Sequence, residues 1–142
     1  MDQNNITGKL SDIRHTILLN APVSRVWDAV ATSEGIAAWF MPNNFQPIDG
    51  YEFTLNAGPF GESPCKVTLL DPPRRLSFNW GKDWTLTFEL EEKGGQTEFT
   101  LIHGGWTVDQ VTEFGETHEL VRDRMDEGWA GLVGKLADYV GV

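Results

Sequence analysis

The sequence predicts an α+β fold in which a curved antiparallel sheet wraps around one long C-terminal helix. Large apolar side chains alternate with polar ones in four runs: Tyr51, Phe53 and Leu55; Leu76, Phe78 and Trp80; Trp84, Leu86, Phe88 and Leu90; and Phe99, Leu101 and His103. Such alternation is typical of an antiparallel sheet that is covered on one face only. The only long helical pattern is the last segment, where apolar residues recur at spacings of three and four: Val121, Met125, Trp129, Leu132, Leu136 and Val140.

A strand and two short helices are expected first. Residues 13–19 alternate with period 2 and predict the first strand. Pro22 then lies in the first turn of a helix with an apolar stripe of Val23, Val26, Trp27 and Val30. Thr32 and Ser33 are typical caps of a second short helix, which we expect to run through Trp39.

From Ile48 onward the pattern predicts a meander of six antiparallel strands, because short turns separate the runs. The turn residues are Asp49 and Gly50, Gly58 and Pro59, Asp71 to Pro73, Gly81 to Asp83, and Gly94 and Gly95. The stretch from Gly104 to Gly115 has no sustained period but is apolar for a loop, with Trp106, Val108, Val111 and Phe114. We expect these residues to pack over the end of the sheet, and a lid is the alternative.

One domain accounts for the whole chain. Residues 1–10 are polar and aperiodic and predict a flexible N-terminal tail, and residues 11–142 form the domain. The closing helix is expected to run from Glu116 to Val140. Inside it glycine costs up to about 1 kcal/mol relative to alanine, yet glycine recurs at every third position, at Gly128, Gly131 and Gly134. Either a close approach of the helix to the sheet or room for a ligand explains this recurrence.

Composition argues against several classes of partner. The chain has 21 acidic and 11 basic residues, and its formal net charge of -10 repels phosphate backbones, so we expect no nucleic acid partner. No apolar run approaches the roughly 18 residues of a membrane span, and no signal-peptide pattern opens the chain. The single cysteine, Cys65, lies in an apolar strand, where we expect a small buried hydrophobe in a reducing, cytoplasmic setting.

Six segments, taken in their order along the chain, resemble one protein family. They are APVSRVWDAV at 21–30, WF at 39–40, IDGYEF at 48–53, PPRRLSFNW at 72–80, TEFTLIH at 97–103 and EGW at 127–129. Together with Leu132 and Leu136 they extend over nearly all of residues 11–140. The chain resembles the bacterial relatives of the activator of the heat-shock chaperone ATPase, which are grouped as SRPBCC proteins. These proteins belong to the START-like superfamily with its helix-grip fold, which also includes the birch-pollen allergen.

The resemblance implies a cavity between the sheet and the C-terminal helix for lipids, polyketide-like molecules or other aromatic ligands. The superfamily contains cyclases and hydrolases as well as pure binders. The eukaryotic activator has an additional domain before the part that this chain resembles, where this chain has about ten residues. We therefore expect no chaperone stimulation, and a chaperone-associated module of the stress response remains an alternative.

The inward positions offer little acid–base chemistry. They carry no carboxylate, and their titratable residues are His15, His103, Tyr51 and Cys65. A histidine on an apolar strand face is more often a hydrogen-bonded core residue than a catalyst, so a cyclase-like or hydrolytic enzyme with such a general base is an alternative only. His118 lies outside the apolar stripe and is expected at the surface. The three histidines lack the spacing of a metal site, and we expect no metal and no cofactor.

The aromatic residues of the inward face favour ligand binding without catalysis. Six tryptophans in 142 residues exceed what a packed core requires. We therefore expect a small hydrophobic ligand, lipid-like, aromatic or polyketide-like, in a cavity between the sheet and the closing helix. The expected ligand-binding residues are Trp39, Phe53, Phe78, Trp80, Trp84, Phe88, His103, Trp106, Met125, Trp129 and Leu132.

Overall fold

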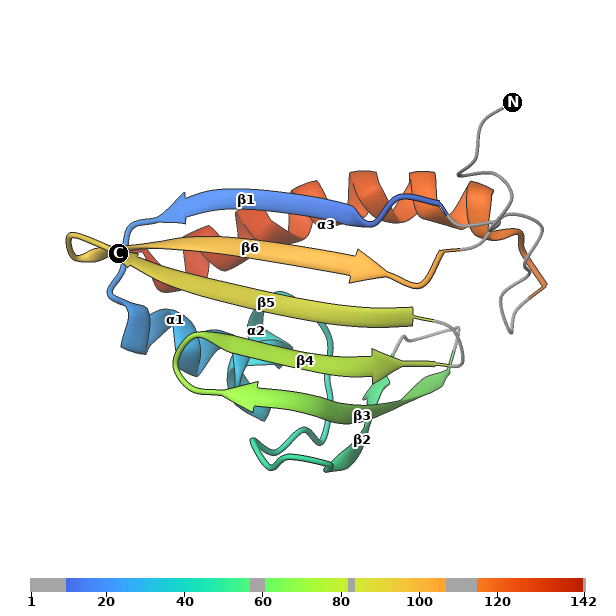
Figure 1. Cartoon of the computed structure of the whole chain (residues 1–142), viewed down its shortest axis with the longest axis horizontal. Coiled ribbons are helices and arrows are strands. Elements are labelled where there is room, and N and C mark those ends of the chain that lie inside the picture. The colour runs from blue at the N-terminus through green and yellow to red at the C-terminus, as the bar shows by residue number, and fades with distance from the viewer. Residues whose placement is uncertain (1–9, 57–60, 82–83, 107–114, 142) are drawn as a thin grey trace.

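The described residues fold into one sheet with three helices on one of its faces. The computed structural model describes residues 10–56, 61–81, 84–106 and 115–141. The elements are β1 (Ile13–Leu19), α1 (Val23–Val30), α2 (Ser33–Trp39), β2 (Glu52–Asn56), β3 (Glu62–Asp71), β4 (Arg75–Trp80), β5 (Trp84–Lys93), β6 (Gln96–Gly104) and α3 (His118–Val140). Figure 1 shows the strands as one layer in front and the helices behind them.

The sheet is antiparallel throughout and confirms the predicted meander, with one correction. Its strand order is β1-β6-β5-β4-β3-β2. Five described strands follow the two short helices rather than six, and β1 completes the sheet by pairing with β6, where Ile13 lies opposite His103. The expected turns at Gly58 and Pro59 and after Gly81 lie outside the described residues in whole or in part.

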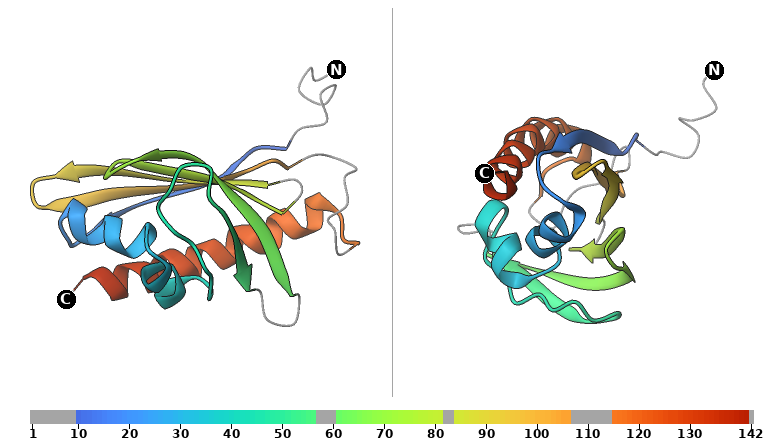
Figure 2. Two further views of the ribbon diagram at one scale, coloured as in Figure 1. Left: turned by 90° about the horizontal axis from the view of Figure 1, so that it is seen from below. Right: turned by 90° about the vertical axis from the view of Figure 1, so that its left-hand side faces the viewer.

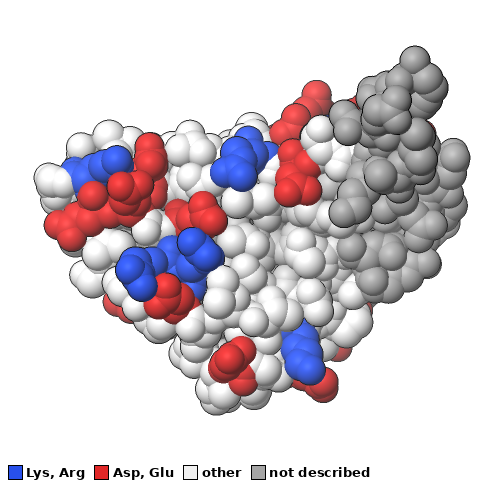
Figure 3. Space-filling view, in the orientation of Figure 1, with Lys and Arg blue, Asp and Glu red and all other residues white. Residues whose placement is uncertain are grey.

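The two faces of the sheet differ as the alternation predicts. On β4, for example, Leu76, Phe78 and Trp80 are buried, whereas Arg75 and Asn79 are exposed. The outer face carries acidic and basic side chains side by side (Figure 3), and short ion pairs join Lys93 to Glu91 at 3.3 Å and Arg75 to Glu89 at 3.7 Å. Both signs of charge are mixed on this face, so its described residues form no extended basic or acidic surface.

Helix α3 lies across the concave face of the sheet, which curls around it in both views of Figure 2. It begins within two residues of the expected start, because the hydroxyl of Thr117 accepts the backbone N–H of Leu120 and caps the first turn. Its C-terminal end is held by α1. There the Arg25 guanidinium donates to the backbone oxygens of Val140 at 2.7 Å and Tyr139 at 2.8 Å, a favourable position for a cation.

The two short helices pack tightly against each other. The hydroxyl of Thr32 accepts the backbone N–H of Gly35 and caps α2, as the sequence predicts. Gly35 is buried where α2 approaches α1, and a Cβ atom at this position would overlap the backbone of Asp28 and Ala29. Only glycine fits this approach. None of the helices among the described residues is long and apolar enough to cross a membrane.

Two expectations about the closing helix are wrong. His118 is fully buried rather than at the surface, because the first turn of α3 lies against Trp84 and Trp106, with ring centroids 6.4 Å and 5.6 Å away. The three recurring glycines neither approach the sheet nor line a cavity. They are exposed, and a Cβ atom would meet nothing within 4 Å at Gly128, Gly131 or Gly134.

The N-terminal segment is described from Leu10, whose backbone N–H donates to the oxygen of Trp106 at 3.0 Å. Leu10 is therefore part of the fold, and the rest of the expected tail lies outside the described residues. Trp106 itself is buried and packs over the end of the sheet, as expected. The other apolar residues of that stretch, Val108, Val111 and Phe114, lie outside the described part of the chain.

Candidate ligand-binding site

An apolar pocket opens where the end of the sheet meets the first half of α3. Its volume is about 460 Å³, within the range of about 300–1,000 Å³ that is typical of small-molecule sites. The wall comes from the segment after α2, from the ends of β2, β3, β4 and β5, from α3 and from the segment just before α3. The lining residues are Phe40, Met41, Pro42, Asn56, Ser63, Trp80, Trp84, Glu116, Val121, Arg124 and Met125.

A second hollow of similar volume differs from this pocket in chemistry. It measures about 470 Å³ and lies over β2, β3 and β4, where its wall includes the exposed polar residues Glu52, Lys66 and Asn79. Such a wall stays hydrated and offers little apolar surface to a ligand. The pocket beside α3 is therefore the better candidate site.

The floor of the pocket belongs to a cluster of aromatic rings. Trp80 from β4 and Trp84 from β5 lie opposite each other in the sheet register, with their ring centroids 5.1 Å apart. Behind them His103 from β6 contacts both rings, at 5.3 Å and 5.0 Å. Trp106 and Trp129 complete this aromatic cluster, at 4.6 Å and 5.9 Å from the His103 ring. Strand pairing thus places residues from three strands at one end of the sheet.

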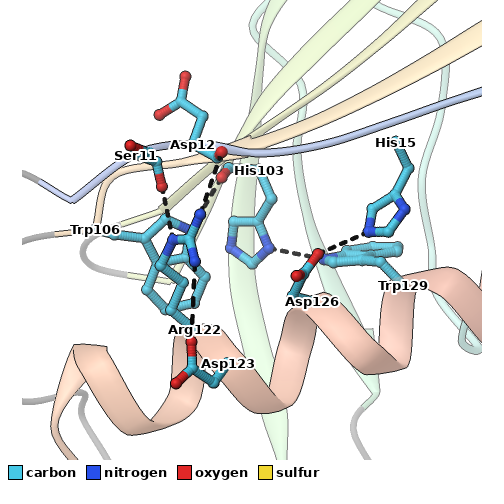
Figure 4. Close-up of polar contacts among 9 residues, drawn as sticks. All are labelled: Ser11, Asp12, His15, His103, Trp106, Arg122, Asp123, Asp126 and Trp129. Carbon is cyan, nitrogen blue, oxygen red and sulfur yellow. Dashed lines mark hydrogen bonds and ion pairs between the residues drawn. The ribbon is translucent and has the colours of Figure 1, made fainter.

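His103 is held as a neutral ring inside this cluster. It has no exposed surface, and the Trp129 indole N–H donates to its Nδ1 at 2.9 Å (Figure 4). The pKa of His103 is lowered from 6.5 to about 3, chiefly by burial and also by electrostatic interaction with Arg122 and His118. Because Nδ1 accepts a hydrogen bond, the ring proton resides on Nε2.

Three ring N–H groups of the aromatic cluster have no hydrogen-bond partner. They are Nε1 of Trp80, Nε1 of Trp84 and Nε2 of His103, and all three atoms are buried. Buried donors in proteins are nearly always paired, so three unpaired donors in one cluster are unusual.

Neither inward histidine is placed as a general base of this pocket. The Nδ1 atom of His103 is occupied by Trp129, and its low pKa makes it a weak base at neutral pH. His15 lies on β1, away from the pocket wall, where its Nε2 contacts the Asp126 carboxylate at 2.9 Å (Figure 4). The described residues include no group of three or more His, Cys, Asp or Glu side chains that would hold a metal ion.

An ion pair stands at the edge of the pocket. Arg124 on α3 donates to both carboxylate oxygens of Glu116, at 3.0 Å and 3.1 Å. The hydrogen bonds from Arg124 lower the pKa of Glu116, and those to Glu116 raise the pKa of Arg124. Both groups are solvent-exposed, so water weakens their attraction and the pair can separate at low cost.

The structure divides the expected ligand-binding residues into three groups. Trp80, Trp84 and Met125 line the pocket. His103, Trp106 and Trp129 form the next layer of the aromatic cluster. The remaining residues lie deeper or farther along the sheet, where they pack against one another or against the core: Trp39, Phe53, Phe78, Phe88 and Leu132.

Several lining residues have no sequence signal of a site. Phe40 and Met41 follow α2, and their position over the end of the sheet depends on how that segment returns from the helix. Arg124 and Glu116 read as ordinary surface charges. Val121 is an exception, because the stripe of the closing helix includes it.

Cys65 is buried, as expected, and lies outside this pocket. Burial raises the pKa of its thiol to about 12, and backbone hydrogen-bonding contacts with Gly81 and Leu55 partly oppose this shift. The thiol is therefore protonated at neutral pH and poorly nucleophilic.

Comparisons with known proteins agree with the fold. The solution structure of protein BH1534 from Bacillus halodurans is 43% identical, with a TM-score of 0.85, and the match covers 94% of this chain and 99% of that chain. The solution structure of the Aha1 dimer from Colwellia psychrerythraea is 20% identical over 94% of this chain and 98% of that chain, with a TM-score of 0.75. CalU16 from Micromonospora echinospora is 23% identical over 91% of this chain and 75% of that chain, with a TM-score of 0.73.

Comparison with the curated proteins gives no significant match. The sequence profile of one family, described as Activator of Hsp90 ATPase homolog 1-like protein, matches residues 20–141. That match covers most of the chain and confirms the resemblance seen in the sequence. The chain belongs to the Activator of Hsp90 ATPase homolog 1-like family.

Proposed function

We propose that this protein binds a small hydrophobic molecule in the pocket beside α3. The observation that carries the proposal is the apolar and aromatic wall of that pocket, formed by Phe40, Trp80, Trp84, Val121 and Met125. Moving an apolar ligand from water onto this wall is favourable by about 25 cal/mol for each Å² of apolar surface that is removed from water.

The side chains of the wall allow the pocket to adapt to its ligand. Met41 and Met125 are half-buried, and their unbranched thioether chains change rotamer at little cost. Trp80 and Trp84 supply flat apolar faces for stacking. These features suit an aromatic or lipid-like body, and Asn56, Ser63, Glu116 and Arg124 add polar contacts around it.

The test uses N-phenyl-1-naphthylamine, an uncharged aromatic probe whose emission rises in apolar surroundings. We expect saturable binding with one probe per chain, and at 100 times its dissociation constant the probe should stabilise the fold by about 2.7 kcal/mol. Val121→Phe places a larger side chain in the pocket and should abolish binding. Leu120→Phe is the matched control, because Leu120 is the neighbouring residue on α3 and is 54% exposed.

Equal probe binding by both variants would show that the probe sits elsewhere and would contradict the proposal. Absence of binding to the wild-type protein, together with a native mass spectrum that shows no co-purified molecule, would also contradict it.

Two alternatives make different predictions. A chaperone-associated module, which the family description raises, should stimulate purified Hsp90 ATPase at micromolar concentration whether or not the pocket is filled. An enzyme with an inward histidine should lose turnover in His103→Gln, although the geometry of His103 does not favour that role. A cytoplasmic location stays a prediction from the single cysteine.

A further inference from the structure

The unpaired N–H groups at the pocket floor suggest what kind of ligand the pocket selects. They belong to Trp80, Trp84 and His103, which we call the donor triad. Their ring centroids lie 5.0–5.3 Å from one another, so the three rings are direct neighbours. Trp80 and Trp84 also line the pocket, whereas His103 lies behind them.

Other buried indoles in the same fold are paired. Trp39 donates to the oxygen of Ala29, Trp106 to the oxygen of His103, and Trp129 to Nδ1 of His103, each at 2.9 Å. The fold therefore satisfies these indoles in its core and leaves unpaired the two indoles that line the pocket. Leaving a buried donor unpaired costs free energy, and a ligand that supplies an acceptor recovers part of this energy.

The protonation of His103 makes it a donor in this group. Trp129 occupies Nδ1 and fixes the tautomer with the proton on Nε2. All three members of the donor triad therefore offer N–H groups, and none offers an acceptor. A ligand with only donor groups gains nothing from this floor.

We propose that the pocket selects ligands that carry a neutral hydrogen-bond acceptor, such as a ketone oxygen, on an aromatic or other apolar body. The indole N–H of Trp80 or Trp84, whose rings line the pocket, donates to this acceptor after a small shift of the ring brings the buried N–H to the pocket surface, whereas His103 stays behind them. The inference rests on the proposed function, because it assigns the polar part of the ligand of the same pocket. A neutral oxygen fits better than a carboxylate at the floor, because the triad contains no cation to pair with a charge that leaves water. The cation of the pocket wall, Arg124, stands at the edge and is paired with Glu116.

The test compares two probes that differ in one group. 2-Acetylnaphthalene carries a ketone where 2-ethylnaphthalene carries a methylene, and the two have the same ring and chain length. Titration of ¹⁵N-labelled protein, followed by NMR, reports both the affinity and the indole N–H resonances, which Trp→Phe variants assign. We expect the ketone to bind at least about tenfold more tightly and to move the Trp80 or Trp84 N–H resonance downfield.

Two variants locate the effect. Trp84→Phe removes one donor but keeps an aromatic ring, so it should weaken ketone binding several-fold and leave binding of the hydrocarbon within about twofold. Trp27→Phe is the control, because Trp27 lies on α1 and does not line the pocket. It should leave the preference for the ketone unchanged.

Each outcome decides between the proposals. Equal affinity for the two probes, with unmoved indole resonances, would overturn the donor triad as a recognition element while the pocket remains. A long-lived water that contacts these N–H groups both with and without the ketone would also overturn it, because the water would then satisfy the donors. If neither probe binds, the failure lies with the proposed function itself.

Discussion

Burial of His103 makes the stability of the fold depend on pH. Its pKa is lowered from 6.5 to about 3 in the folded protein, whereas in the unfolded chain the ring titrates near 6.5. Between these values the unfolded state binds a proton that the folded state does not bind. The free energy of unfolding therefore rises with pH in this range, and the contribution of His103 is fully present above about pH 6.5 and is lost as pH falls.

The magnitude follows from the two pKa values. In the unfolded chain about a quarter of the His103 rings are protonated at pH 7 and nearly all are protonated at pH 5, while the folded ring stays neutral. Integration over this interval gives a loss of about 2 kcal/mol from this residue alone. Both pH values lie above the isoelectric point of about 4.6, so the protein keeps a negative net charge during the measurement.

The assay is urea unfolding of the wild-type protein and of His103→Asn at pH 7, 6 and 5. Asparagine does not titrate, and its side-chain oxygen can still accept the Trp129 N–H. We expect the wild type to lose about 2 kcal/mol more than the variant over this interval. His15→Asn is the matched control, because it replaces the half-buried histidine of the neighbouring strand and leaves His103 in place, so the contribution of His103 should remain.

Parallel pH profiles of the wild type and His103→Asn would refute this reasoning. If the variant does not fold, the ring protons of His103 in the wild-type protein give the same answer by NMR, since they should not titrate between pH 7 and pH 5.

Three further predictions concern stability and reactivity. Trp129→Ala should lower the free energy of unfolding, measured in urea, by about 3–5 kcal/mol, as expected for a packed core residue. The reason is that Trp129 is 1% exposed and its indole N–H is hydrogen-bonded. A much smaller loss would show that the Trp129 side chain is loosely packed. Gly131→Ala should stabilise the protein by about 0.5–1 kcal/mol because its Cβ meets open space, whereas Gly35→Ala should destabilise it severely; thermal melts check both. Cys65 should resist alkylation at pH 8 in the folded protein and react readily in urea; rapid labelling without denaturant would contradict its burial.

The fold was predictable because its signals are local. Period 2 defines the inner face of each strand, and Thr32 marks the start of α2 through its capping hydroxyl. The same reasoning located the apolar stripe of α3, in which Trp129 and Leu136 are buried. These patterns depend only on nearby residues and on the geometry of a single element.

The site was less predictable because it depends on tertiary contacts. Alternation places both Phe88 and Trp84 on the inner face of β5, but it does not tell which part of that face the helices cover. Phe88 packs against Trp39 of α2, whereas Trp84 lies at the other end of β5, beside the first turn of α3, and lines the pocket. The surface position expected for His118 is wrong for the same reason, because its burial comes from rings on other elements. Whether the pocket residues bind a ligand stays a prediction.

The pairing of β1 with β6 sets an order for folding during synthesis. Of the described strands, β1 leaves the ribosome before the others, yet its hydrogen-bonding partner in the sheet, β6, is made after the others. Until β6 emerges, the inward side chains of β1, including Ile13 and Leu19, have no sheet to join. Long-range strand pairing of this kind is slow and leaves apolar segments open to aggregation. A nascent chain that ends before residue 96 should therefore depend on chaperones more than the completed protein does.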